Sequence, residues 1–328
     1  MSSSDPNGSV WARLRPAVYR GDVTAAGAIP LALAAIVIEL RMRQWAVGPR
    51  LLIVGVIAAL ILTMGWLTPL ETPSPRQYHS MLLLAGMLPL LIALQLLAEV
   101  LGAQRPPGAG GDAWTFGAVA AFAAAAGRRA NSAACTLVAA LAGAVAVEAL
   151  VVWLFNPHGT GAERWVLLLL TLGLIAGAVR LRDRQRRHAV ALVNAAGLLT
   201  LAIALTYLVG GYISEITNEA GSLPLIAHIG VPFGWELFVL AIGFGLVAYA
   251  GADREPGPAY IGVSVLLAFA LLVGLPALNG SSLAWWPLFL MALGVVGLVI
   301  GLRPSTPAPP PPETEVAPAI PIREDPQA

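Results

Sequence analysis

The sequence contains no lysine, and all 19 of its basic residues are arginines. Without an ammonium side chain, the protein can form neither a lysine Schiff base nor a phosphate loop that depends on lysine, and it has no lysine base. Charged residues make up only 11% of the chain, against roughly 25% in soluble domains. Cys135 is the only cysteine, which excludes an intramolecular disulfide and a cysteine-based metal cluster.

Signatures of catalysis are also missing. The four histidines lie far apart, and none has the spacing that places two metal ligands on one helix face. There is no glycine-rich phosphate loop and no Ser-His-Asp arrangement. We therefore predict no catalytic residue, no cofactor and no metal site, and we favour a non-enzymatic role. Nucleic acid is not an expected partner, since the net charge is only +1.

Hydrophobic residues are abundant instead, at 58% of the chain with a mean hydropathy of +0.78. Such a composition requires the lipid bilayer as solvent. A spanning helix needs roughly 20 apolar residues, and long runs without strand-like alternation must be helical. The sequence predicts an all-α, polytopic transmembrane helix bundle in the cytoplasmic (inner or plasma) membrane. Its ten expected spans are residues 24–40, 51–70, 80–101, 113–127, 132–155, 165–179, 189–210, 235–250, 260–278 and 285–302.

The chain ends differ from this bundle, which we place at residues 23–302. Residues 1–22 form a polar N-terminal arm, and the apolar segment that follows has no small-residue cleavage site. Residues 303–328 are rich in proline and polar side chains, which predicts a disordered tail. The longest internal loop, residues 211–234, is expected to fold back as an amphipathic or re-entrant piece.

An arginine-dense turn sets the expected topology. Arginine at the centre of a span costs about +2.5 to +3.5 kcal/mol, and short loops rich in arginine stay cytoplasmic. Ten spans place both termini in the cytoplasm, with fourteen arginines inside and five outside. If the segments at Thr24 and Ala113 do not cross, seventeen arginines lie inside and two outside. We prefer ten, because no charge interrupts the Ala113 segment. The turn's arginines are Arg180, Arg182, Arg184, Arg186 and Arg187.

Four glutamates, Glu39, Glu99, Glu148 and Glu236, fall in the outer half of the spans on this topology. Intramembrane carboxylates usually face a bundle interior and mark an ion or substrate path. Gln95 lies one turn before Glu99 and forms a polar pair with it on the same helix face. For Glu39 and Glu236, a simple reach to interfacial water is the favoured interpretation. Glu148 lies deepest, and for it the two interpretations are evenly balanced.

Three functions are compatible with these patterns. The leading hypothesis is a transporter or permease whose outward-facing cavity is lined by the glutamates. The alternative is a non-catalytic scaffold or accessory subunit that binds a membrane-protein partner, or a second copy of itself, through small-residue faces such as Gly173 to Gly177. A transferase acting on a lipid-linked substrate ranks last, because the outer loops are too short to hold a donor. No motif identifies a substrate or a coupling ion.

Overall fold

The computed structural model describes residues 21–68, 77–103, 108–157, 160–218, 231–277, 290–292 and 294–295. The segments before residue 278 form nine long helices and contain no strand. The helices are α2 (Gly21–Arg41), α3 (Val47–Leu67), α4 (Gln77–Val100), α5 (Ala109–Ala130), α6 (Ala133–Phe155), α7 (Gly161–Leu181), α8 (Arg186–Asn218), α9 (Phe233–Asp253) and α10 (Pro256–Ala277).

Each of the first nine expected segments is confirmed as a helix, but several boundaries were wrong. Helix α3 begins at Val47, so Arg50 lies in its first turn and not in a loop. Helix α10 begins at Pro256, because proline suits a first helical turn, where no partner for its missing N–H is needed. Helix α8 runs on to Asn218, into the expected 211–234 loop. The arm up to residue 20, the tail, the rest of that loop and most of the tenth segment lie outside the described residues.

Local sequence accounts for the sharp turns between helices. Asn131 and Asn156 end α5 and α6 in the left-handed conformation, at φ 49° and 40°. Asparagine tolerates that conformation better than other non-glycine residues. Ser132 then starts α6, and its side chain accepts a hydrogen bond from the Cys135 backbone N–H, which is the usual role of serine at a helix start.

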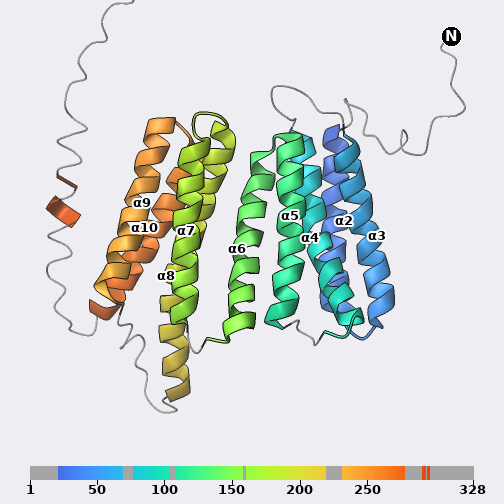
Figure 1. Ribbon diagram of the computed structural model, residues 1–328, viewed down its shortest axis with the longest axis horizontal. Helices are drawn as coiled ribbons and strands as arrows, with labels where there is room; N and C mark the ends of the chain where they lie inside the picture. The colour runs from blue at the N-terminus through green and yellow to red at the C-terminus, as the bar shows by residue number, and fades with distance from the viewer. Residues whose placement is uncertain are drawn as a thin grey trace, which may run out of the picture. The chain divides into compact units, whose positions relative to one another are not determined.

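Successive helices run in opposite directions (Figure 1). One set of turns, at residues 131–132, 182–185 and 254–255, lies at the end of the helices that we call the anchor edge. The turn at 42–46 and the end of α6 at 155–157 lie at the other end, the opposite edge. The five arginines of the 180–188 turn are therefore at the anchor edge, and the ends of α2 and α4 with Glu39 and Glu99 are at the opposite edge.

Helices that follow one another pack as antiparallel hairpins, α3 with α4, α5 with α6, α7 with α8 and α9 with α10. Helix α2 packs on α4, α6 on α8, and α8 on α10. The α9–α10 pair approaches most closely at glycines: a Cβ added at Gly262 would lie 2.9 Å from the Gly243 carbonyl oxygen. Small residues at such crossings are typical of helix pairs in membranes.

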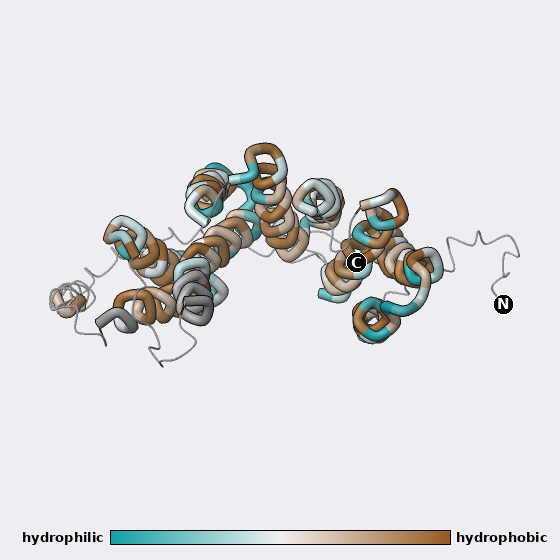
Figure 2. The backbone as a smooth tube through the Cα atoms, turned by 90° about the horizontal axis from the view of Figure 1, so that it is seen from below, coloured by the Kyte–Doolittle hydropathy of each residue, from teal (hydrophilic) through white to brown (hydrophobic). Residues whose placement is uncertain are grey.

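Eight of the described helices are long and apolar enough to cross a membrane. Helix α5 is the exception, since it has the same length but is rich in alanine and glycine and carries Asp112, Arg128 and Arg129. Hydrophobic residues run along the helices, and hydrophilic residues gather at their ends (Figure 2). Large apolar side chains such as Leu52, Leu169 and Val263 lie exposed. A surface of this kind requires lipid contact, so the chain is a multi-pass membrane protein.

The chain divides into two units, residues 1–280 and 281–328. The first contains all nine helices and every site discussed below. In the second, the described residues are a short helical stretch at 290–292 and 294–295.

Candidate functional site

Arg50 is the most buried charged side chain at the opposite edge, with 1% of its surface exposed. Its guanidinium Nη1 donates to Glu39 Oε2 at 3.1 Å, and its Nη2 lies 3.9 Å from Glu99 Oε1. The two carboxylates come from the last turns of α2 and α4. A single cation therefore joins the ends of three helices.

The surroundings of this cluster explain why the arginine can be buried. Ala35, Val54 and Leu96 pack directly beneath it in a small apolar core shared by α2, α3 and α4. The two glutamates remain about one-fifth exposed, at 22% and 21%, so they keep contact with water while neutralising the buried charge. The structure brings Glu39 and Glu99 together around an arginine. Gln95 is half-buried one turn away on α4.

Glu148 occupies a different place. It is half-buried on α6, and the negative charge of Glu163, in the first turn of α7, acts on it from the neighbouring helix. Among the described residues, neither carboxylate has a hydrogen bond or an ion pair. Two half-buried acids thus lie on adjacent helices, and neither is paired with a cation in the described parts of the chain.

Arg164, the residue after Glu163, is directed away to α8. Its Nε donates to Thr206 Oγ1 at 3.0 Å, and its guanidinium lies 3.5 Å from the centre of the Tyr207 ring. Tyr207 in turn lies beside Trp235 of α9, at 6.2 Å between ring centroids. A cation over an aromatic ring is favoured when it is partly desolvated. Arg164 is therefore held by α8 and does not pair with Glu148 or Glu163.

Glu236 is the fourth predicted acid, and it is buried in the first turn of α9, next to Trp235. The four glutamates therefore share one edge but form separate groups. Glu39 and Glu99 lie at Arg50, Glu148 lies beside Glu163, and Glu236 lies at the start of α9.

At the anchor edge, the predicted arginines are all exposed, but two of them make specific contacts. Arg182 Nη2 donates to Asp253 Oδ1 at 2.7 Å, and Arg186 Nη2 donates to the Asp253 backbone oxygen. The hydrogen bond to Asp253 and the negative charge of that residue raise the pKa of Arg182 above its usual value. The turn is thereby tied to the end of α9, while Arg180, Arg184 and Arg187 face solvent.

A buried histidine, which the sequence did not single out, joins the helices at the same edge. His188 Nε2 lies 2.9 Å from Asn131 Oδ1, and its Nδ1 lies 2.6 Å from Thr136 Oγ1. Ser132 Oγ meets Ser80 Oγ at 2.9 Å. The network connects the first turns of α4, α6 and α8 through polar side chains, and its only sequence signal is a set of polar residues next to turns.

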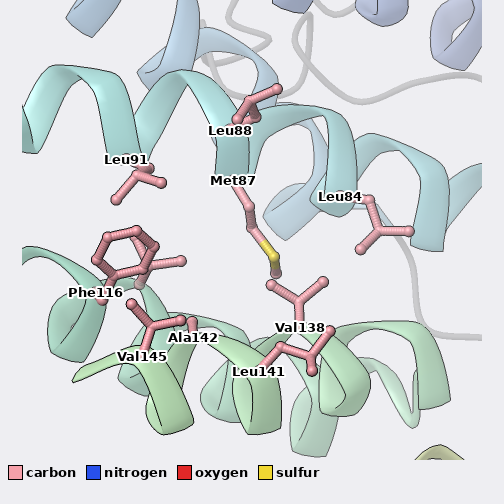
Figure 3. A pocket seen from close by; sticks show the side chains of 10 residues that line it. Leu84, Met87, Leu88, Leu91, Phe116, Val138, Leu141, Ala142 and Val145 are labelled. Atoms are coloured by element: carbon pink, nitrogen blue, oxygen red, sulfur yellow. The ribbon is translucent and has the colours of Figure 1, made fainter. Parts of the chain in front are cut away.

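Among the described helices, three of the hollows have walls that contain none of the predicted glutamates. The first, of about 310 Å³, is entirely apolar: Met87 of α4 points toward Val138 of α6, and Phe116 of α5 lies at the other side, near Leu91 (Figure 3). The second, of about 640 Å³, lies between α5 and α6, and the third, of about 350 Å³, lies among α7, α8 and α9. No group of three or more potential metal ligands is present in the described parts of the chain.

The sequence matches no known family, and no curated protein or solved structure is significantly similar to it. The functional argument therefore depends on the residues themselves.

Proposed function

We propose that this multi-pass membrane protein is a transporter that carries protons across the membrane, with Glu148 and Glu163 as the proton-binding residues. The observation that carries the proposal is the placement of these two acids on adjacent helices, half-buried and without a cationic partner. A half-buried carboxylate is costly to ionise, and the negative charge of a second acid on the next helix adds to that cost, so protonation of Glu148 is favoured.

The depth of Glu148 supports the same role. It lies seven residues before the end of α6 at Phe155, which is about 10 Å along the helix at 1.5 Å per residue. A carboxylate at that depth is costly unless it faces a polar partner or can be neutralised. Arg164 is the nearest cation in sequence to Glu163, but it is engaged by Thr206 and Tyr207. Protonation is then the available means of neutralising the pair.

We also propose that the anchor edge faces the cytoplasm. Among the described residues, eight arginines lie at the anchor edge and four at the opposite edge. Arginine-rich short loops remain on the cytoplasmic side. The acid pair would then open toward the outside, as would Glu39, Glu99 and Glu236.

Proton uptake into proteoliposomes tests the proposal. The full-length protein is reconstituted with an enclosed pH-sensitive dye, and a potassium diffusion potential is imposed. We expect uptake above that of protein-free liposomes, and loss of that uptake in Glu148→Gln and in Glu163→Gln. Asp183→Asn is the matched control, because Asp183 is exposed at the anchor edge. Wild-type uptake equal to empty liposomes, or full uptake in Glu148→Gln, would refute the proposal.

A second candidate function, a scaffold or accessory subunit, has one observation in its favour. The hollow of about 640 Å³ between α5 and α6 is lined by small residues, including Gly110, Gly111 and Ala113, with Trp114 and Trp153 beside them. Of the described long helices, α5 is the least suited to contact lipid. A helix of another protein could therefore pack closely against this face through its small residues. Extraction in mild detergent followed by mass analysis should then find a stoichiometric partner, and a monodisperse single chain would count against this function.

A further inference from the structure

The hollow among α7, α8 and α9 has a polar end and an apolar body. Its volume is about 350 Å³, and its walls include Ala178 and Val179 of α7, Val193 of α8 and Ile242 of α9. Arg182 and Tyr249 also line it, and both lie near the anchor-edge ends of their helices. The hollow therefore runs from the anchor edge into the hydrocarbon layer.

Its length suits a lipid chain. On α9 the lining extends from Ala241 to Tyr249, which is about 12 Å at 1.5 Å per residue. Val179 and Gly245 are exposed along this wall, so the hollow is open to the bilayer from the side.

The polar end is positively charged. Residues 180–187 and 253–255 together contain six arginines and three acids, Asp183, Asp253 and Glu255. Arg182 is bonded to Asp253, yet its side chain remains 50% exposed. The surplus charge lies where an anionic head group would reach, and basic pockets between helices at the cytoplasmic face are recognised sites for such head groups.

Tyr249 adds a second polar group at this end. The Tyr249 hydroxyl is buried and has no hydrogen bond of normal geometry, although it lies close to Asp253, whose Oδ2 is also without one. Buried hydroxyls are normally hydrogen-bonded. A phosphate or ester oxygen at this end would accept the hydroxyl hydrogen, while its charge is met by Arg182.

We propose that this hollow binds an anionic phospholipid, with one acyl chain between α7, α8 and α9 and the phosphate against Arg182 and the Tyr249 hydroxyl. The site is separate from the acid pair, so it does not depend on the proposed transport activity. Its recognition has two parts: the hollow selects for a chain, and the arginines select for negative charge.

Gly245 provides a test of the hollow. A Cβ added there would meet nothing within 4 Å, so Gly245→Leu fills the space without displacing a neighbour, and leucine is a better helix former than glycine. Gly173→Leu is the matched control: Gly173 also has open space at its Cβ, but it lies on α7 outside the lining. The charge is tested by Arg182→Gln combined with Asp253→Asn, which removes the ion pair without leaving a buried charge.

The measurement is binding of a fluorescent phosphatidylglycerol to the purified full-length protein in neutral detergent, with unlabelled lipids as competitors. Dioleoyl phosphatidylglycerol should compete about tenfold better than dioleoyl phosphatidylcholine, and glycerol phosphate, which has no chain, should not compete. Gly245→Leu should weaken phosphatidylglycerol binding about tenfold, with Gly173→Leu unchanged. The double variant removes the Arg182 contact but keeps the surplus positive charge of this end, so the preference for phosphatidylglycerol should weaken without vanishing. Equal competition by the two lipids, competition by glycerol phosphate alone, or unchanged binding in Gly245→Leu would overturn the proposal.

Discussion

The Arg50 cluster predicts an unequal response to removal of its members. In Glu39→Gln, the guanidinium remains in a site with 1% exposure and loses the carboxylate at 3.1 Å, leaving Glu99 at 3.9 Å. In Arg50→Met, the buried position receives an apolar side chain, and the two remaining carboxylates are each about one-fifth exposed. Water can solvate the carboxylates but not the guanidinium, so the loss of Glu39 should be the more harmful change.

The magnitude follows from the burial of each partner. Breaking a buried ion pair by removing one member costs about 3–5 kcal/mol, and the partial exposure of Glu39 together with the remaining Glu99 reduces the expectation for Glu39→Gln to about 2–3 kcal/mol. Arg50→Met should lower the unfolding free energy by about 1–2 kcal/mol, because the carboxylate side of the lost ion pair is partly exposed to water. The loss of stability in the double variant should be smaller than the sum of the two single losses, and the difference should be about 1–2 kcal/mol.

Reversible unfolding in mixed micelles, with increasing mole fraction of an anionic detergent and tryptophan fluorescence as the signal, measures these free energies. Asp183→Asn is the control, since Asp183 is exposed at the anchor edge, and it should change stability by less than about 0.5 kcal/mol. The reasoning fails if the Arg50 and Glu39 changes add to within about 0.5 kcal/mol. It also fails if Arg50→Met proves more destabilising than Glu39→Gln.

Three further predictions concern the helix contacts and the topology. His188→Phe removes both ring hydrogen bonds of the anchor-edge network and should lower the unfolding free energy by about 1–3 kcal/mol, measured by the same detergent titration. Gly262→Val forces atoms against the Gly243 carbonyl oxygen at 2.9 Å and should lower Tm, whereas Gly274→Ala, with open space at its Cβ, should leave Tm unchanged or raise it; equal losses in both would contradict the close packing. In a Cys135→Ala background, a cysteine at Arg184 should react with a membrane-impermeant maleimide only from the cytoplasm, and a cysteine at Arg43 only from outside; the reverse pattern would invert the proposed orientation.

The helices themselves were predictable, because long apolar runs leave a backbone in lipid no alternative to helix. Their ends were harder to locate. Arg50 follows a turn-like Val-Gly-Pro sequence, so its charge suggested a loop, but two carboxylates from neighbouring helices allow it to lie within α3. Only tertiary contacts contain that information.

The candidate sites were partly predictable for a similar reason. The position of each acid along its helix follows from counting residues, so the sequence correctly grouped Glu39 and Glu99 at one edge. It could not show which helices are neighbours. Glu163 lies in the first turn of α7, where an acid usually complements the helix dipole, and only the packing of α6 near α7 places it beside Glu148. The His188 network was missed because its members are scattered over α4, α6 and α8.

Helix α8 is 33 residues long, which corresponds to about 50 Å at 1.5 Å per residue, well beyond a hydrocarbon thickness of about 30 Å. A helix of this length exceeds the hydrocarbon layer by about 20 Å, so it must either tilt strongly or extend among the lipid head groups and water.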